Sequence, residues 1–331
     1  MISYTEKHKN NGINKIEIIV KKYFLLLVFL GMVCITWAKP PKTYTVHPTY
    51  ADIKYGLHER NVLDLWIAKS DVPTPLVIYV HGGGFSGGSK EKLNMTYLKK
   101  MLANGISVVS VNYRYCKGEK DGALASIGDV RRAVQYLRSR SKEWNIDKQH
   151  IGMWGGSAGA GATLWIAFHD ELADAESDDP VLRESSRLQA ACGVAVQSTY
   201  DTFTWPALLN ISEDSPLMKQ LHDNWTPKWL GLKSINDKDT PRGFQMRKDL
   251  DIISMITPDD PPFLVFNNAK GTIPPTEFGQ MVHHPLFAKM LYEKGKECRV
   301  DCRACTPNAP EYGLNDPMIV PEFFIKYLKI Y

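Results

Sequence analysis

The chain has 331 residues, of which 44% are hydrophobic, and a formal net charge of +4. This length and composition can bury one large core, so we expect a single globular domain and no disordered or low-complexity chain. The small charge gives no reason to expect nucleic acid or another polyanion as a partner.

Residues 1–38 have the layout of a secretory signal peptide. A polar stretch with five lysines precedes an apolar run from Tyr23 to Ala38, about 16 residues long, which is short for a bilayer span of roughly 20. Thr36 and Ala38 are small residues at the positions that signal peptidase reads. We predict cleavage after Ala38, a secreted or periplasmic mature domain of residues 39–331, and no stable membrane span after cleavage. An uncleaved membrane anchor is the alternative.

Five cysteines follow the predicted cleavage site: Cys116, Cys192, Cys298, Cys302 and Cys305. An odd number allows at most two disulfides in an oxidising compartment. The last three cysteines are closely spaced, but zinc sites generally need a second pair of ligands at comparable spacing. We therefore expect no metal and no cofactor. We expect Cys298 and Cys302 on the same side of one strand. Whether one of them forms a disulfide is left open.

Short apolar runs alternate with helical patterns from about residue 50 to the end. This alternation predicts an α/β fold with a mostly parallel central sheet and helices on both faces. Expected strands are Leu76–Val80, Val108–Val111, Ile151–Trp154, roughly Cys192–Gln197, Pro261–Phe266 and a short strand at the last cysteines. Expected helices cover residues 127–137, the segment after residue 157, residues 286–291 and Phe323–Leu328. Residues 202–255, rich in Trp, Pro and charge, predict a small lid insertion.

The expected strand Ile151–Trp154 leads directly into Gly155-Gly156-Ser157-Ala158-Gly159 and then into a helical pattern. A serine on a sharp turn between strand and helix needs small neighbours, because the turn is strained and the helix must approach the strand closely. The glycines here meet that need. Ser157 is therefore the candidate nucleophile.

A second motif, His81-Gly82-Gly83-Gly84, directly follows the expected strand Leu76–Val80. Glycines in such a loop let backbone N–H groups turn toward a developing oxyanion. Two motifs in this order, each at a strand end, are far more specific than either motif alone.

With these two motifs the chain resembles the α/β-hydrolase superfamily, and within it esterases similar to hormone-sensitive lipase and to secreted bacterial feruloyl or acetyl esterases. The resemblance covers roughly residues 50 to 331 and includes three further segments, Asn112-Tyr113-Arg114, Trp144-Asn145-Ile146-Asp147 and Asp260-Pro261-Pro262-Phe263. It implies that Ser157 is the nucleophile and that the amides of Gly83, Gly84 and Ala158 form the oxyanion hole. The resemblance also implies that His81 is structural.

Two positions of the usual catalytic triad depart from the family pattern. In the resembling esterases an acid follows the seventh strand, but this chain reads Asn267-Asn268-Ala269-Lys270-Gly271 there. The family's histidine follows the eighth strand, yet His284 is the last histidine and Glu311 stands in the matching stretch. A carboxylate is a much weaker base than an imidazole, so this exchange alone would cost most of the rate.

Replacements must lie at the carboxyl edge of the sheet, where ligands bind in open α/β folds. His283 and His284 end an 18-residue connection that starts after the strand 261–266, and Pro285 suits the first turn of the next helix. We predict that one of them is the general base, kept neutral by the helix N-terminus. Asp201, after the strand 192–197, could orient the ring. The alternatives are helix caps or contacts with the lid for the histidines, and a turn or lid cap for Asp201.

The sequence predicts a serine-dependent carboxylic ester hydrolase with a rearranged general base, acting on an extracellular small-molecule or carbohydrate-linked ester. The alternative is a secreted binding protein of the same fold that has lost turnover. Three tryptophans of the expected lid either pack its interior or stack on a sugar or an aromatic acyl group, namely Trp205, Trp225 and Trp229. The two parts of the substrate, the disulfide pairing and the oligomeric state are left open.

Overall fold

The computed structural model describes residues 44–328, which form one unit. The predicted signal peptide and its cleavage site lie outside these residues. Among the described helices, none has the length and apolar character needed to cross a membrane.

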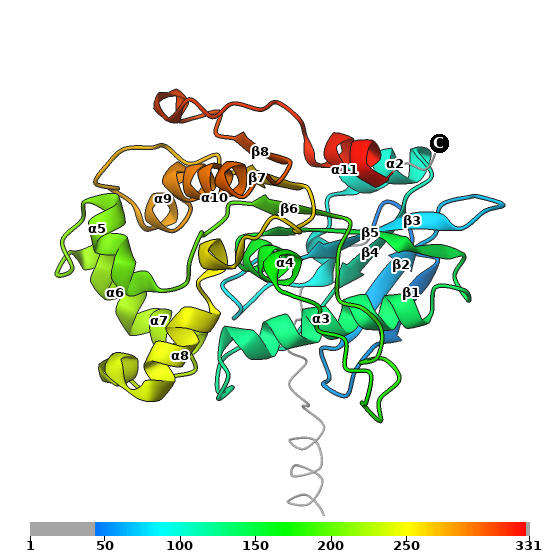
Figure 1. The fold of residues 1–331 in the computed structure, drawn as a ribbon, viewed down its shortest axis with the longest axis horizontal. Coiled ribbons are helices and arrows are strands. Elements are labelled where there is room, and N and C mark those ends of the chain that lie inside the picture. Colours follow the sequence, from blue (N-terminus) through cyan, green and yellow to red (C-terminus); the bar gives the residue numbers. More distant parts are fainter. Residues whose placement is uncertain (1–43, 329–331) are drawn as a thin grey trace, which may run out of the picture. The chain divides into compact units, whose positions relative to one another are not determined.

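Eight strands form a single sheet in the order β1-β2-β4-β3-β5-β6-β7-β8 (Figure 1). The first two strands pair antiparallel with their neighbours, and every pairing from β3 and β4 to β8 is parallel. The strands are β1 Tyr50–Lys54, β2 Val62–Trp66, β3 Thr74–Val80, β4 Ser107–Val111, β5 Ile146–Gly156, β6 Ala190–Val194, β7 Phe263–Phe266 and β8 Cys302–Cys305. The predicted α/β fold with a mostly parallel sheet is confirmed.

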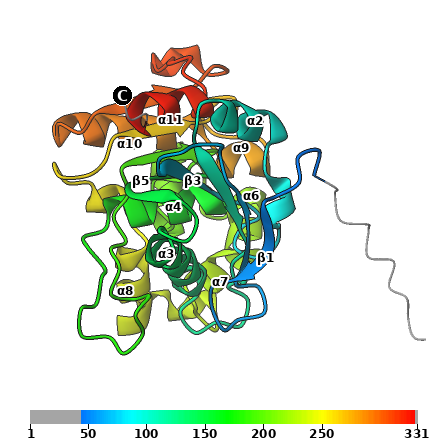
Figure 2. The same ribbon diagram turned by 90° about the vertical axis from the view of Figure 1, so that its right-hand side faces the viewer.

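Helices cover both faces of the sheet (Figures 1 and 2). On one face lie α2 (Met95–Ala103) and α11 (Val320–Leu328), whose buried side chains share a core cluster with the sheet. On the other face a larger cluster joins α3 (Ala123–Ser139), α4 (Ala158–Phe168) and α10 (Pro285–Glu297). Central strands such as β4 are buried along their whole length, which is why they read as continuous apolar runs in the sequence.

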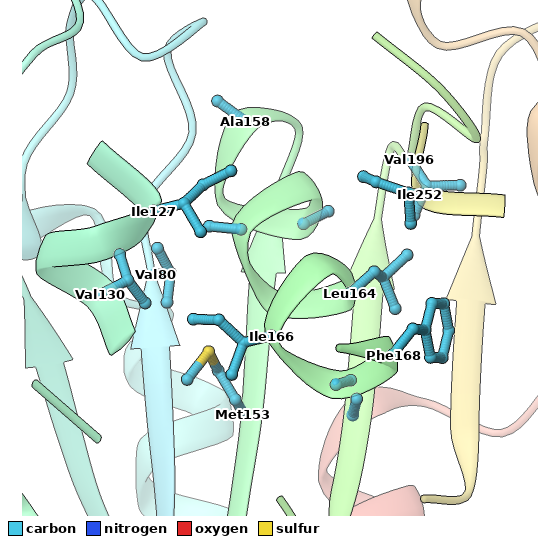
Figure 3. Close-up of a cluster of buried hydrophobic side chains, with 14 of the residues drawn as sticks. Val80, Ile127, Val130, Met153, Ala158, Leu164, Ile166, Phe168, Val196 and Ile252 are labelled. Carbon is cyan, nitrogen blue, oxygen red and sulfur yellow. The ribbon is translucent and has the colours of Figure 1, made fainter. Parts of the chain in front are cut away.

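Helix α4 lies against the middle of the sheet. Ten of its eleven residues are buried, which explains why this helix is apolar on all sides. Figure 3 shows Ile166 of α4 next to Met153 of β5, with Ile127 and Val130 of α3 on the same side. The helix is therefore fixed between the sheet and α3, and the turn before it is fixed as well.

Residues 202–255, predicted as a lid insertion, form short helices that lie together with α9 at one side of the sheet in Figure 1. They are α5 (Trp205–Leu209), α6 (Pro216–Asn224), α7 (Thr226–Trp229) and α8 (Pro241–Asp249), with 3-10 turns at Thr202–Thr204, Ile235–Asp239 and Ile252–Met255. Trp205 is fully buried and packs on Phe287 of α10. Its role is packing, one of the two roles left open by the sequence.

Two details differ from the sequence predictions. Strand β6 ends at Val194, three residues earlier than expected, because Ala195 takes a positive φ of 57° that leaves the strand conformation. Cys298 does not share a strand with Cys302, because it is the residue that ends α10, and Arg299, with φ 62°, follows it. All five cysteines of the described residues are free thiols.

A buried ion pair supports the start of the sheet. Lys90, at the 3-10 turn Lys90–Lys92, is 5% exposed and places its Nζ 2.6 Å from Oδ2 of Asp64 on β2, which is 1% exposed. The backbone N–H of Lys90 donates to Oδ1 of Asn112 at 2.7 Å, and its carbonyl accepts from Ser110 at 2.6 Å. The pair therefore joins the segment after residues 81–88 to β2 and the end of β4.

We expect Asp64→Ala to lower the free energy of unfolding by more than about 1 kcal/mol, because it removes the buried partner of the Lys90 ammonium and leaves only the more exposed carboxylates of Asp52 and Glu91 beside it. Urea unfolding at pH 7 measures this change. The matched control is Glu322→Ala, which removes an exposed pair with Lys100 and should change the free energy much less than Asp64→Ala does, because solvent screens exposed pairs. Equal effects of the two substitutions would show that the buried pair contributes no more than a surface pair.

Candidate active site

Ser157 occupies the turn between β5 and α4 in a strained conformation, with φ 51° and ψ −117°. Two glycines make the turn sterically possible. A Cβ at Gly155 would collide with the backbone of Gly159, and a Cβ at Gly159 would collide with the carbonyl oxygen of Val80. Small residues here let α4 start almost in contact with the sheet, and the serine is displayed above its carboxyl edge. The local geometry predicted from the glycines is present.

The loop that follows β3 faces this turn. Gly83 and Gly84 have φ of 119° and 60°, which is the region that favours glycine. Both residues line the same pocket as Ser157 and Ala158. Ala158 is the first residue of α4, so the helix itself leaves the N–H group of Ala158 without an intrahelical acceptor.

His81 is buried beneath the glycine loop and does not reach Ser157. Its Nδ1 lies 2.9 Å from the carbonyl oxygen of Gly82, and its ring stacks on Tyr113 with 4.3 Å between the centroids. The hydroxyl of Tyr113 donates to the carbonyl of His81 at 2.8 Å. Burial lowers the pKa of His81 to about 4, so the ring is neutral near pH 7. These contacts are those of a structural residue.

The imidazole of His283 lies at the candidate nucleophile. Its Nε2 is 2.9 Å from Oγ of Ser157. His283 immediately follows the short helix α9 (Phe278–Val282) within the long connection after β7. This distance is that of a hydrogen bond, and neutral imidazole at this place can accept the hydroxyl proton.

Among the described residues, no carboxylate is hydrogen-bonded to the His283 ring, and Oγ of Ser157 is its hydrogen-bond partner. The backbone N–H of His283 donates to the carbonyl of Gly279, one turn earlier in the chain, at 3.2 Å. Burial lowers the pKa of His283 below its ordinary value, and the nearby backbone of Gly279 opposes that shift in part. Burial, and not the helix N-terminus expected from the sequence, is the main cause of the shift.

His284 points away from Ser157 and caps α10. It is fully buried, and its Nδ1 accepts a hydrogen bond from the N–H of Leu286 at 3.2 Å. Its Nε2 lies 3.5 Å from the hydroxyl of Tyr312. Burial lowers the pKa of His284 as well. Of the two adjacent histidines, the structure places one at the nucleophile and gives the other the helix-capping role that the sequence had left open.

Asp201 does not orient either histidine. Because β6 ends at Val194, Asp201 lies well beyond the strand end, and its Oδ1 accepts from Nε of Arg247 on α8 at 2.9 Å. It also accepts from the N–H of Phe203, as a cap of the turn that starts at Thr202. Glu311 is exposed, in the turn Pro310–Tyr312, and lies beside Gly271. In the described structure Asp201 is therefore hydrogen-bonded to neither histidine, and its contacts are those of the turn cap that the sequence had left as the alternative.

Two buried carboxamides beside His283 were missed by the sequence analysis as site residues. Gln197 is 3% exposed and donates from Nε2 to the carbonyl of Val282 at 2.6 Å. Asn267 is fully buried and donates from Nδ2 to the carbonyls of His283 and His284 at 3.2 and 3.0 Å. Asn267 opens the stretch after the seventh strand in which the resembling esterases have an acid, and this departure was the signal available in the sequence.

The pocket above Ser157 and His283 has a volume of about 400 Å³. Its wall is mostly aromatic and aliphatic. Among the residues described, the only titratable side chains in this wall are those of His283 and Tyr200. The remaining wall residues are Gln197, Tyr200, Trp225, Trp229, Phe278, Gly279 and Val282. Trp225 and Trp229 come from the segment predicted as a lid. Trp225 packs directly over Gly84, and Nε1 of Trp229 donates to the carbonyl of Gly84 at 2.9 Å.

Within residues 44–328 no three His, Cys, Asp or Glu side chains are grouped so that they could hold a metal ion. The chemistry that this arrangement supports is nucleophilic. The arrangement consists of a serine hydroxyl, an imidazole in hydrogen-bond contact with it, backbone N–H groups nearby, and an apolar pocket.

Comparison with known proteins points to esterases. Esterase LipC of Mycobacterium tuberculosis is 24% identical over 261 residues, which are 73% of this chain and 58% of LipC. Among solved structures, a truncated carbohydrate esterase from gut microbiota shares the fold with a TM-score of 0.59 at 17% identity, covering 80% of this chain and 89% of that one. Esterase 2 of Thermogutta terrifontis, in a form phosphonylated by sarin, has a TM-score of 0.56 at 17% identity and covers 86% and 94%.

The chain spans only 52–58% of the length of the mycobacterial esterases that it matches. A family model matches residues 63–286, a range that includes the glycine loop, the strained serine and His283. This match covers more than half of the sequence, and the chain therefore belongs to the BD-FAE family of α/β-hydrolases.

Proposed function

We propose that the protein is a serine carboxylesterase in which His283 serves as the general base. The observation that carries this proposal is the 2.9 Å separation between Oγ of Ser157 and Nε2 of His283. A serine hydroxyl is a weak nucleophile until a base in hydrogen-bond contact removes its proton. No other histidine in the described part of the chain contacts Ser157.

In the first half of the reaction, Oγ of Ser157 attacks the ester carbonyl carbon while Nε2 of His283 takes the hydroxyl proton. The carbonyl oxygen becomes an oxyanion, which the N–H groups of Gly83, Gly84 and Ala158, all residues of the pocket wall, stabilise in this proposal. The imidazolium then gives its proton to the alkoxide oxygen as the bond between carbon and leaving group breaks. An acyl-serine and a free alcohol result.

In the second half, water enters the place of the alcohol. His283 removes a proton from the water as its oxygen attacks the acyl carbon, and returns that proton to Oγ of Ser157 when the tetrahedral intermediate collapses. The carboxylic acid leaves and the serine is regenerated. The backbone bond from the N–H of His283 to the carbonyl of Gly279 holds the main chain that carries the imidazole beside Ser157.

The contact between Ser157 and His283 also argues against the alternative, a binding protein that has lost turnover. A binding pocket requires the apolar wall but gives no reason for a strained serine and an imidazole to meet at its base. The wall of Trp225, Trp229 and Phe278 suits a neutral acyl group. Since the structural neighbours include a carbohydrate esterase, a small-molecule or carbohydrate-linked ester outside the cell is the proposed substrate class.

We expect Ser157→Ala to abolish hydrolysis of short-chain chromogenic esters, because Ser157 carries the only aliphatic hydroxyl among the described residues that line the pocket. A fluorophosphonate should modify the unaltered protein at Ser157, just as sarin phosphonylates esterase 2 of Thermogutta terrifontis. Mass spectrometry of the modified peptide locates the adduct. Retained turnover in the alanine variant would refute the assignment of the nucleophile.

The two adjacent histidines provide a matched pair of variants. We expect His283→Ala to reduce kcat by at least a hundredfold, because it removes the base. His284→Ala should change kcat by only a few-fold and should instead lower stability by about 1 kcal/mol, since it removes a helix cap. Steady-state kinetics and thermal unfolding measure the two effects. If the His284 variant loses activity and the His283 variant does not, the base has been assigned to the wrong residue.

The wild-type pH profile tests the ionisation of the same group. The reaction needs neutral His283, and burial holds the pKa of His283 below the ordinary value of 6.5. Activity should therefore fall as the pH drops through a midpoint below 6.5 and should level off as the pH rises toward 8. The measurement is kcat/KM from pH 4.5 to 8, which reports groups of the free enzyme. An acid limb centred above 6.5 would mean that a carboxylate raises the pKa of the catalytic base.

A further inference from the structure

Asn267 lies directly after β7, with its backbone N–H bonded to the carbonyl of Cys305 at 3.0 Å. Its side chain is fully buried, and main-chain groups take up all of its hydrogen bonds. Oδ1 accepts from the N–H of Val196 at 2.7 Å, and Nδ2 lies 3.1 Å from the carbonyl oxygen of the same residue. The remaining two acceptors of Nδ2 are the carbonyls of His283 and His284.

Gln197 extends this set of contacts by one residue. Its Nε2 donates to the carbonyl of Val282 at 2.6 Å, and its Oε1 accepts from the hydroxyl of Tyr200 at 3.1 Å. Two carboxamides from the ends of neighbouring strands therefore hold three consecutive carbonyl groups, at residues 282, 283 and 284. The second of these carbonyls belongs to His283 itself, and the other two belong to its neighbours in the chain.

We propose that Asn267 and Gln197 form an amide clamp, a pair of positioning residues that aim His283 at Ser157 through the main chain. The clamp takes over the task for which a triad uses a carboxylate on the ring, and this inference rests on the proposed function of His283. Because the clamp fixes the backbone on either side of the imidazole, no negative charge is required to orient it.

The chemistry of the side chain explains why this position holds an amide and not an acid. A carboxylate at position 267 could still accept from Val196 but has no N–H group to donate. It would place a buried negative charge against the carbonyl oxygens of Val196, His283 and His284, which is unfavourable without compensating donors. The contacts made by Nδ2 therefore require asparagine.

The decisive variants are Asn267→Ala and Asn267→Asp, assayed in the whole protein by the second-order rate of inactivation with a fluorophosphonate. Both should react at least tenfold more slowly than wild type, because a displacement of about 1 Å can cost up to a hundredfold in rate. With a chromogenic ester, kcat should fall by a similar factor while KM stays within threefold, since Asn267 does not line the pocket. Rates are expressed per folded molecule, measured by circular dichroism.

Gln135→Ala is the matched control. Gln135 of α3 is also fully buried, and its amide donates to two main-chain carbonyls, those of Leu182 and Glu184, away from the pocket. Its loss should lower stability but leave the inactivation rate within twofold of wild type. If the Asn267 variants react at the wild-type rate, or if the control slows as much as they do, the clamp is refuted. A faster Asn267→Asp would also refute it, because the position would then act as an acid.

Two further measurements cover the remaining cases. If the Asn267 variants do not fold, Gln197→Glu removes the donor to the carbonyls of Val282 and Ala195 and keeps the acceptor for Tyr200. It should slow inactivation severalfold. If wild type itself does not react with the phosphonate, the proposed esterase function fails. The clamp is then judged by ¹⁵N NMR of labelled histidine. His283 should show one neutral tautomer in wild type and in Gln135→Ala, but averaged shifts in Asn267→Ala, and equal spectra would refute the clamp.

Discussion

The close approach of α4 to the end of β5 is the constraint on which the rest of the site depends. The helix can start within contact distance of the sheet only because Gly155 and Gly159 carry no side chains. That approach forces Ser157 into a conformation with φ 51°, and the packing of α4 between the sheet and α3 maintains the strain. Strain of this kind is tolerated where the surroundings determine the backbone completely. Here it places a hydroxyl above the sheet beside the first free N–H group of a helix.

The imidazole reaches this hydroxyl by an unusual path for the fold. It comes from the connection after β7, and the backbone that carries it is held by the carbonyl of Gly279 and by the carboxamides of Gln197 and Asn267. Neutral partners of this kind do not stabilise an imidazolium as a carboxylate does, so burial dominates and the pKa of His283 lies below its ordinary value. The arrangement favours a base that is neutral over a wide pH range, at the cost of weaker stabilisation of the ion formed in the transition state.

The sequence was sufficient for features that depend on local geometry and insufficient for those that depend on tertiary contacts. Ser157 and the glycine loop could be placed because the turn and the strand order are encoded by neighbouring residues. The choice between His283 and His284 could not be made, because it depends on which of them caps α10. Both lie just before Pro285, and the sequence alone does not show which side chain turns toward the helix. Asp201 was misplaced because a positive φ at Ala195 ends β6 early, and no residue type in the sequence marks that bend.

The central claim is that Ser157 and His283 act as one catalytic pair without a carboxylate partner. A crystal structure of the protein after reaction with a fluorophosphonate tests it most directly, because the adduct imitates the tetrahedral intermediate. We expect phosphorus bonded to Oγ of Ser157, Nε2 of His283 about 3 Å from that oxygen or from a phosphonyl oxygen, and another phosphonyl oxygen at about 2.7–3.1 Å from the amides of the glycine loop and Ala158. An adduct contacted by a different imidazole, or a His283 ring whose Nδ1 is bonded to a carboxylate, would contradict it.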